Sequence, residues 1–302
     1  MNCDFFVFHP FFLTFAPQNR TIKKKIIKMG IIIGIDVGIS TTKIVGLKDG
    51  HITAPTRITA ADPITSLYGA FGKYLHDNNI ELSDVKQVMM TGVRSAYIKG
   101  SVYGLPTQKV EEFVADGLGA RFESKLDHTI VVSMGTGTSF VLCDGDEMRH
   151  IGGIGVGGGT LAGLSRLLLN TSDIKAVSAL AMQGNTKTVH LLIGDISAEP
   201  LPNLPMDATA SILAKAQSDA AKEDIAAGII SMVLQTIGSA AWLSSRGSDI
   251  RDFVLIGNLT LLPQCKDVFP PLEQLYNIRY HIPKYSQYCT AIGAALSYKS
   301  EK

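Results

Sequence analysis

Residues 30–43 read Gly-Ile-Ile-Ile-Gly-Ile-Asp-Val-Gly-Ile-Ser-Thr-Thr-Lys, and this stretch decides the fold. The β-branched run at 31–35 predicts a buried strand, and residues 43–47 predict a second strand after a tight turn. The turn follows Asp36, so its N–H groups and hydroxyls can surround phosphate oxygens while the carboxylate holds Mg²⁺ or its water shell. The alternative is an ordinary hairpin with a solvated lysine. The predicted phosphate contacts are Gly38, Ser40, Thr41 and Lys43.

The same pattern returns about a hundred residues later. Residues 129–133 predict a buried strand, 134–139 a turn of glycine and threonine, and 140–143 a return strand. Two such units predict two similar lobes related by internal duplication. Their turns would then hold one polyphosphate from two sides. In the second turn the predicted contacts are Gly135, Thr136, Gly137 and Thr138.

Residues 152–160, Gly-Gly-Ile-Gly-Val-Gly-Gly-Gly-Thr, form the densest glycine segment and run directly into a predicted helix at 161–169. So many glycines are costly to order unless the backbone needs unusual dihedral angles or a ligand approaches closely. A helix N-terminus also carries a partial positive charge. We expect contact with nucleotide or substrate here; the alternative is a purely structural turn. The predicted nucleotide contacts are Gly157, Gly158, Gly159 and Thr160.

The rest of the chain alternates between strand and helix patterns, which predicts an α/β architecture. Strands are expected at 52–58, 85–91, 252–257 and 278–283, and helices at 63–78, 111–122, 173–183, 208–217, 220–244 and 290–297. The alanine-rich helix at 220–244 is either a dimer interface or a core helix that crosses behind the site.

Together the three glycine segments resemble the acetate and sugar kinase/Hsp70/actin superfamily. The order of 107–115, 133–139 and 150–160 is similar to type II pantothenate kinases, and 194–196, 255–258 and 291–294 fit the same order. This resemblance covers about residues 30–297. It implies two ribonuclease-H-like lobes of an actin-like ATPase fold, at 29–127 and 128–302, with a nucleotide cleft between them. It also implies nucleotide contacts at Gly257 and Asn258.

The resemblance further implies ATP- and Mg²⁺-dependent phosphorylation of pantothenate to 4'-phosphopantothenate, the first step of coenzyme A biosynthesis. In this family a glutamate of a Glu-Phe-x-Ala segment takes the proton from the primary hydroxyl of pantothenate, and the matching residue is Glu112. Its neighbour Glu111 is the competing candidate, because helical geometry places them about 100° apart and only one can face the cleft. The spacing to Gly119 favours Glu112. The alternative is that both acids only complement the helix dipole.

The sequence departs from the family pattern at three places, one of which is Ile154, where the family has threonine after two glycines. The first turn has Ile39 where the family usually has glycine, and a positive φ there would be strained. The family's arginine that grips the substrate carboxylate is replaced by His150. These departures leave the substrate more open than the fold. The candidate substrate contacts are Arg149, His150, Gly152, Gly153 and Arg94.

Composition excludes several other classes of protein. The chain has 302 residues, a formal net charge of +1 and 46% hydrophobic residues, which is typical of a globular protein. Outside residues 1–28 acids slightly outnumber bases, so there is no electrostatic case for nucleic-acid binding. None of the four cysteines forms a Cys-x-x-Cys pair, so neither a zinc nor an iron–sulfur site is predicted. A reduced, cytoplasmic setting fits this cysteine usage.

Residues 1–28 do not match the rest of the chain. An apolar stretch at 5–16 is too short to span a bilayer, and the lysines follow it instead of preceding it as in a secretory signal. We expect a translation artefact or a disordered leader before Met29, with an anchoring leader as the alternative. We expect no membrane partner, and the resemblance favours a homodimer.

Three other functions remain open on the sequence. The first turn also resembles ATPases that activate radical dehydratases, although the cysteines of those proteins are not matched here. A kinase of the same superfamily could act on another hydroxylated acid or sugar. An actin-like protein could use nucleotide only as a switch, but such a switch has no need of the base Glu112.

Overall fold

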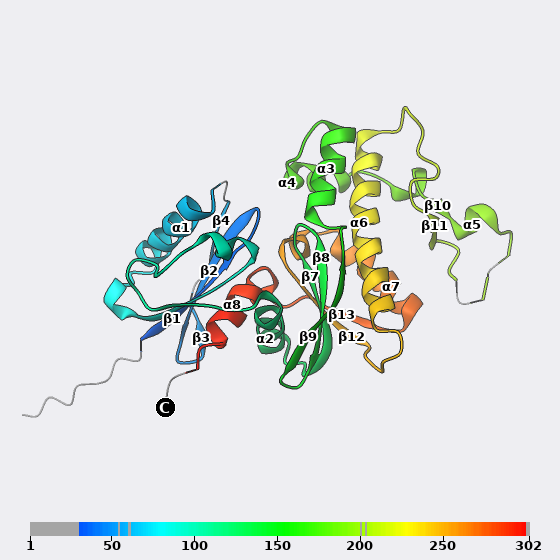
Figure 1. The fold of residues 1–302 in the computed structure, drawn as a ribbon. Helices are drawn as coiled ribbons and strands as arrows, with labels where there is room; N and C mark the ends of the chain where they lie inside the picture. The colour runs from blue at the N-terminus through cyan, green and yellow to red at the C-terminus, as the bar shows by residue number, and fades with distance from the viewer. Residues whose placement is uncertain (1–29, 54, 60–61, 200, 203, 300–302) are drawn as a thin grey trace, which may run out of the picture.

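The computed structural model describes residues 30–299 apart from 54, 60–61, 200 and 203. The predicted leader at 1–28 lies outside these described residues. The described chain forms two α/β lobes, each built on one sheet, and two helices lie between them (Figure 1).

The first sheet has the strand order β3-β2-β1-β5-β6, with β4 paired to β2. Strand β1 (Ile31–Val37) is buried along its whole length, as its β-branched sequence predicts. It pairs antiparallel with β2 and parallel with β5. The other strands are β2 (Thr41–Lys48), β3 (His51–Ile52), β4 (Thr56–Thr59), β5 (Val85–Thr91) and β6 (Thr107–Lys109).

The second sheet repeats this topology. Read from β9, its order is β9-β8-β7-β12-β13, where β7 is antiparallel to β8 and parallel to β12. The strands are β7 (His128–Met134), β8 (Thr138–Asp144), β9 (Glu147–Ile154), β12 (Asp252–Ile256) and β13 (Arg279–His281). The matching orders and directions confirm the internal duplication of two similar lobes.

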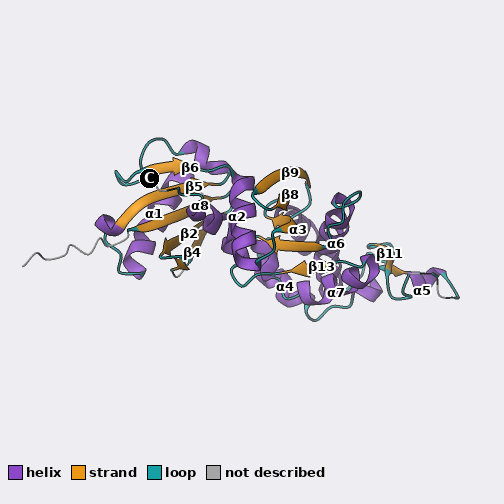
Figure 2. Cartoon of the chain, turned by 90° about the horizontal axis from the view of Figure 1, so that it is seen from below, coloured by secondary structure: helices purple, strands orange, loops and turns teal. Residues whose placement is uncertain are grey.

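Helices cover the outer face of each sheet (Figure 2). On the first sheet, α1 (Pro63–Asp77) buries Phe71 and Tyr74, and it begins where the Asp62 side chain accepts a hydrogen bond from Thr65 N at 2.7 Å. The second sheet's outer face is covered by α3 (Gly158–Leu169), α4 (Ile174–Ala181), α6 (Lys222–Ser244) and α7 (Cys265–Tyr276). Five 3₁₀ turns complete these connections: η1 (Leu82–Asp84), η2 (Val93–Tyr97), η3 (Thr186–Thr188), η4 (Asn258–Leu261) and η5 (Ser286–Tyr288).

The inner faces of the two sheets are covered by helices that have changed places. Helix α2 (Glu112–Ser124) follows the first sheet in sequence but packs on the second, and α8 (Cys289–Leu296) follows the second sheet but packs on the first. They cross each other so closely that a Cβ at Gly119 would lie 1.8 Å from Cys289 O, and one at Gly293 would lie 1.7 Å from Ala115 O. The ranges 29–127 and 128–302 thus each hold one whole sheet. The last helix of each range, however, packs on the sheet of the other range.

Three expectations about local structure are corrected. The helix expected at 208–217 is absent: β11 (Thr209–Ser211) pairs with β10 (Leu191–Leu192) around the short α5 (Ile193–Ile196), and the φ of +58° at Leu213 is incompatible with a right-handed helix. Helix α7 was not expected, because it contains Pro270 and Pro271. It forms because the burial of Phe269 outweighs the cost of the two prolines. The glycine segment does lead into a helix, but α3 begins at Gly158 and not at 161, and the first residues of the segment, to Ile154, belong to β9.

Helix α6 is a core helix. Eleven of its residues are buried, and it packs against α3, α4 and α7. Among the described residues it is the one helix whose length and composition would allow it to cross a membrane, and a mostly buried core helix passes the same test. Of the two alternatives for residues 220–244, a dimer interface or a core helix, the buried face of α6 therefore confirms the core helix.

Candidate active site

The first turn joins β1 to β2 with a short, partly exposed connection. Gly38 N donates to Thr41 O at 3.1 Å, which closes the turn, while Ile39 and Ser40 are exposed. Ile39 does not adopt a positive φ. The replacement of glycine by isoleucine therefore causes no backbone strain here, and the side chain points out of the fold with 45% of its surface exposed.

Asp36 and Lys43 form a buried ion pair below this turn. Lys43 Nζ lies 3.3 Å from Asp36 Oδ2, and both side chains are more than 90% buried. The alternative of a solvated lysine is therefore wrong. Gly92, at the end of β5, has a φ of +91°, and a Cβ there would lie 2.6 Å from Asp36 Oδ1. A glycine is thus required at this position for the carboxylate to keep its place.

The second turn and the glycine segment hold each other in place. Gly158 N donates to Gly135 O at 2.9 Å, and Gly159 N donates to Thr136 O at 2.8 Å. The hydroxyl of Thr138 donates to Val156 O at 2.8 Å. These two N–H groups and this hydroxyl are therefore occupied within the chain, so the N-terminus of α3 supports the second turn. The main chain at Gly135 and Thr136 stays exposed.

The Gly157 position shows why the segment needs its glycines, because a Cβ there would lie 2.6 Å from Thr136 O. The hydroxyl of Thr160 donates to Gly155 O at 3.0 Å and caps α3 from within. Whether Gly157, Gly158, Gly159 and Thr160 contact a nucleotide stays a prediction, since the observed contacts are internal.

Gly257 and Asn258 connect the two turns. Asn258 Nδ2 lies 3.4 Å from Thr41 Oγ1, across from one lobe to the other. A Cβ at Gly257 would lie 2.5 Å from Met134 O, where the second turn begins. The structure therefore brings the first turn, the second turn and the segment after β12 to one place between the lobes.

The start of α2 separates the roles of its two glutamates. Glu111 is exposed, and its carboxylate accepts a hydrogen bond from Val114 N at 2.8 Å, so it caps the helix. Glu112 is half-buried. Burial raises the pKa of Glu112 to about 7, and the negative charges of Asp116 and Asp36 act in the same direction, while Lys43 opposes them. Of the two glutamates, Glu112 is the one in the electrostatic environment of the Asp36–Lys43 pair.

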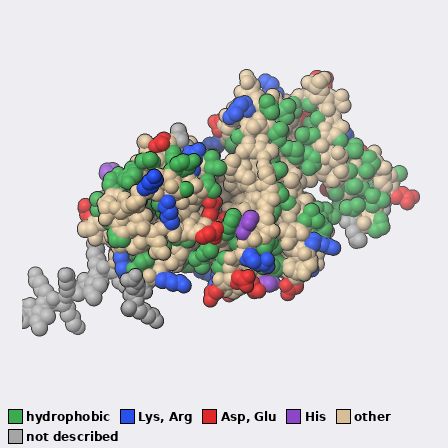
Figure 3. Space-filling view, viewed as in Figure 1, with side chains coloured by type: hydrophobic (Ala, Val, Ile, Leu, Met, Phe, Trp, Pro, Cys, Tyr) green, Lys and Arg blue, Asp and Glu red, His purple; other side chains and the backbone are tan. Residues whose placement is uncertain are grey.

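Asp116 is a residue of this site that the sequence reasoning missed. It is 1% exposed, one helical turn after Glu112, and its Oδ1 accepts a hydrogen bond from the Thr290 hydroxyl of α8 at 2.6 Å. Burial raises its pKa to about 7, opposed by that hydrogen bond and reinforced by Asp36. An acid four residues after Glu112, between Ala115 and Gly117, was the available signal. Acidic side chains also gather at the junction of the lobes in Figure 3.

The three basic candidates for the substrate site lie in different surroundings. His150 pairs with Val141 on the α2 face of the second sheet, and its ring stacks on Phe113 with centroids 4.0 Å apart and an interplanar angle of 10°. Arg149 pairs with Leu142, which packs in the core on the opposite face. Arg94 lies in η2, close to the start of α1: the pKa of Asp62 there is lowered mainly by its hydrogen bonds from Thr65, and the charge of Arg94 adds a small contribution. The structure thus places His150, and not Arg149, beside the helix that carries Glu112.

Gly152 and Gly153 are strand residues of β9, where they pair with Phe140 and Ser139. A register shift next to Phe140 leaves Ile151 without a direct cross-strand partner, and Gly152 has a φ of +150°. This bulge bends the strand directly beside His150.

The site offers one carboxylate for a cation. Among the described residues, no group of three or more His, Cys, Asp or Glu side chains could hold a metal ion. Asp36 alone fits Mg²⁺, because this ion usually takes one or two carboxylates together with substrate phosphates and water. Cys143, Cys265 and Cys289 are buried free thiols.

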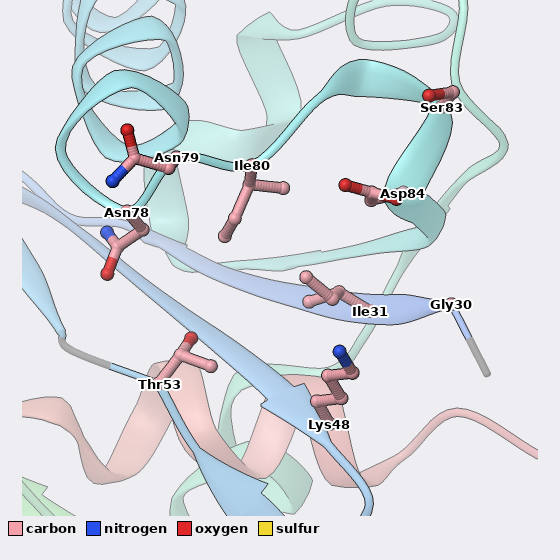
Figure 4. Close-up of a pocket in the computed structure, with 9 residues that line it drawn as sticks. All are labelled: Gly30, Ile31, Lys48, Thr53, Asn78, Asn79, Ile80, Ser83 and Asp84. Atoms are coloured by element: carbon pink, nitrogen blue, oxygen red, sulfur yellow. The ribbon is translucent and has the colours of Figure 1, made fainter. Parts of the chain in front are cut away.

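Two cavities lie away from this site. One of about 330 Å³ is at the opposite end of β1, where Lys48, Asn78, Ile80 and Asp84 line it (Figure 4). A larger one of about 1330 Å³ lies between α6, α7 and the β10–β11 excursion, and its lining includes Trp242 and Leu204. Neither lining contains a residue that the sequence predicts for the site.

The chain is similar to proteins of known families. The Fumble family model matches residues 95–264, more than half of the chain. The type II pantothenate kinase of Staphylococcus aureus strain USA300 is 29% identical over 236 residues, which cover 75% of this chain and 84% of that protein. The corresponding protein of strain NCTC 8325 matches equally well.

Solved structures show the same fold. An activator of 2-hydroxyisocaproyl-CoA dehydratase from Clostridium difficile, with bound ADPNP, superposes with a TM-score of 0.65 at 19% identity and covers 88% of this chain and 93% of that one. A ROK family glucokinase from Streptomyces griseus, in complex with glucose and AMPPNP, gives 0.56 at 14% identity over 88% and 98% of the two chains. The fold of two ribonuclease-H-like lobes, the actin-like ATPase fold, is therefore confirmed.

Proposed function

Because the chain belongs to the Fumble family, we propose that it transfers the γ-phosphoryl group of ATP to the primary hydroxyl of pantothenate. The observation that carries the proposal is the position of Glu112. It stands at the start of a helix between the lobes, near Asp36 and Lys43, and has a pKa of about 7. A carboxylate with such a pKa is suited to take a proton near neutral pH. The two structural neighbours with bound ATP analogues support ATP as the phosphoryl donor.

In the proposed reaction Glu112 accepts the proton of the acceptor hydroxyl. The hydroxyl oxygen then bonds to the γ-phosphorus, and the bond from that phosphorus to the β–γ bridging oxygen breaks, so that 4'-phosphopantothenate and ADP form. Most of the rate gain in such a reaction comes from positioning and charge stabilisation. In this proposal Lys43 and the exposed main chain of the two turns hold the phosphates, between the two lobes that Asn258 joins.

Asp36 is the residue that would hold Mg²⁺. The ion would supply charge neutralisation at the phosphate oxygens. The protein's own residues keep this carboxylate fixed, through the ion pair with Lys43 and the close approach of Gly92.

We further propose that His150 contacts the carboxylate of the acceptor. It faces the same side of the second sheet as α2, and Phe113 fixes its ring. Arg149 lies on the other face, and its Nε is 3.6 Å from Glu147 Oε1. Arg94, Gly152 and Gly153 stay secondary candidates for substrate contact.

The test is a coupled assay of ADP release by the full chain with ATP and Mg²⁺, with and without pantothenate. We expect pantothenate-dependent ADP release and a product with the mass of phosphopantothenate. Glu112→Gln should lower kcat by about 100-fold or more, because a positioned base contributes that much, and leave binding of an ATP analogue nearly intact. Glu111→Gln is the matched control and should keep most of the activity. A fully active Glu112→Gln protein would contradict the proposal.

A second function within the same family of reactions is favoured by one observation. Histidine carries less permanent charge than the arginine expected at position 150, so the acceptor could be another hydroxylated acid or a sugar. ATP binding without pantothenate turnover would support this alternative and direct the search to other alcohols. Dehydratase activation would instead predict bound iron, which elemental analysis of the purified protein detects. As part of the main proposal, the protein is a homodimer and acts in the cytoplasm.

A further inference from the structure

Asp116 is a buried acid with no part in the reaction proposed above. It lies four residues after Glu112 on α2, so the two side chains share one face of the helix, about 5–6 Å apart at their Cβ atoms. Asp116 is 1% exposed. A buried carboxylate is costly unless it is paired with a cation or protonated, so its presence needs a physical account.

The surroundings of Asp116 contain more negative than positive charge. The groups that act on it or on Glu112 are Asp36 of β1, Lys43 of β2 and Glu111 of α2. Lys43 is the one cation among them, and Asp36 already pairs with it at 3.3 Å. The thiols of Cys143 on β8 and Cys289 on α8 also face Asp116, but their raised pKa values keep them neutral. The buried Asp116 and the half-buried Glu112, one turn apart, therefore compete for too little positive charge, and a proton can supply the balance.

Burial raises the pKa of Asp116, while the hydroxyls of Thr290 and, second to it, Ser133 of β7 lower it and so favour the proton on Glu112. The Thr290 hydroxyl donates to Asp116 Oδ1 at 2.6 Å, and this bond favours the ionised form of Asp116. The charge on Asp116 in turn disfavours the ionised form of Glu112. Thr290 lies on α8, the helix that crosses α2 at Gly119 and Gly293, so the donor is held rigidly against its acceptor.

We propose that Asp116 is a positioning residue that acts through Glu112: its negative charge, one helical turn away, makes Glu112 a stronger base. The pair titrates as a unit, so the apparent values belong to the pair and not to one residue. This inference rests on the proposed function only in assigning Glu112 as the base. Asp116 itself need not touch the substrate.

The test compares the pH dependence of kcat for the full chain and for Asp116→Asn. Asparagine keeps the shape of the side chain and an acceptor for Thr290 but removes the charge. Glu112 then ionises more easily, so the acidic limb of the profile should move to lower pH, by about one unit for the loss of one close charge. One unit below the original midpoint, relative activity should then rise about fivefold. A lower kcat with an unmoved midpoint would show a structural role only and overturn the proposal.

Two further variants sharpen the comparison. Thr290→Val removes the hydrogen bond that favours charged Asp116, so Asp116 takes the proton first and the limb should shift in the same direction, by less. This variant also serves if Asp116→Asn does not fold. Glu111→Gln removes one charge from the same helix at an exposed position, where water screens it, and should move the midpoint least. A shift for Glu111→Gln as large as for Asp116→Asn would overturn the proposal.

A measurement without turnover separates this inference from the proposed function. The raised pKa values of Glu112 and Asp116 mean that the folded chain binds more protons than the unfolded chain between about pH 4 and 7, so stability should fall as pH rises through this range. In Asp116→Asn that fall in Tm should be smaller. If pantothenate is not phosphorylated but the Tm profile flattens, the function fails and the charge coupling between Asp116 and Glu112 stands. An unchanged Tm profile contradicts the pair whatever the substrate.

Discussion

His150 and Arg149 are neighbours in sequence but lie on opposite faces of β9, which makes them a natural pair for testing the substrate site. Only His150 reaches the face that carries α2, where its ring stacks on Phe113. An Arg149 side chain that is 61% exposed and beside Glu147 has no path to that face.

We predict that His150→Ala raises the KM for the acceptor about tenfold or more, because a hydrogen bond to a charged group contributes about 1.5–3 kcal/mol. Arg149→Ala should leave the same KM within a factor of two. Initial-rate kinetics at saturating ATP measures both. The reverse ranking of the two variants would move the substrate to the other face of the sheet.

At this scale the sequence predicts candidate segments but not the faces on which their side chains lie. The three glycine segments and Glu112 could be proposed because each signal is local: a strand, a turn and a helix start follow one another along the chain. The spacing of Asp116 from Glu112 was a visible signal, but its partner Thr290 is 174 residues away, so its burial and hydrogen bond were not. The choice between Arg149 and His150 depends on the pairing of β9 with β8, where they lie opposite Leu142 and Val141, and on which core each of those residues enters.

The crossing of α2 and α8 is the element on which the geometry of the site depends, since α2 carries Glu112 and Asp116 and α8 carries Thr290. The two helices approach so closely that glycine is required at Gly119 and Gly293. The backbone contact also explains why α8 has small residues along its length.

We predict that Gly293→Ala destabilises the protein by about 3 kcal/mol, because its Cβ would lie 1.7 Å from Ala115 O and one helix would have to move. Gly163→Ala on α3 is the matched control. Its Cβ meets no atom within 4 Å, so it should stabilise the protein by about 0.5–1 kcal/mol through helix propensity. Urea unfolding followed by circular dichroism measures the difference. Equal stability of the two variants would contradict the close crossing.

The elements themselves were largely predictable where a pattern was long and periodic. Strands β1, β5 and β7 and helices α1, α2 and α6 lie where the sequence placed them. The wrong predictions at 208–217 and at α7 have one cause, because tertiary packing overrides local composition in both. The alanines of 208–217 favour a helix, but part of this segment pairs with β10 as a strand. The prolines of α7 disfavour a helix, but the buried face of α7 stabilises it.

Across the whole molecule, the two lobes are joined by the α2–α8 crossing and by side-chain contacts. Among the described residues these contacts include Asn258 to Thr41 and Arg57 to Gln287, both at 3.4 Å. The crossing is a close approach of two helix backbones, whereas each side-chain contact is a single hydrogen bond. The side-chain contacts are therefore the connections that can open while the lobes stay attached.

We predict that Asn258→Ala shifts the balance between closed and open lobes towards the open form by about fivefold, the equivalent of a hydrogen bond of about 1 kcal/mol. The radius of gyration of the nucleotide-free protein should increase in small-angle scattering, and an ATP analogue should bind more weakly. Thr41→Val should behave in the same way, and Thr41→Ser should not, because serine keeps the hydroxyl. An unchanged radius in Asn258→Ala would contradict the prediction and show that the crossing and the Arg57–Gln287 bond hold the lobes without it.

The exchange of α2 and α8 between the sheets also governs the order in which the chain can fold as it leaves the ribosome. The first sheet is synthesised early, but the helix that covers its inner face, over Ile32, Val45 and Met89, is the last of the described elements to be made. Helix α2, in turn, is made before the sheet that it covers. Neither lobe can finish its core alone, so the nascent chain keeps apolar surface available to chaperones until translation has passed α8.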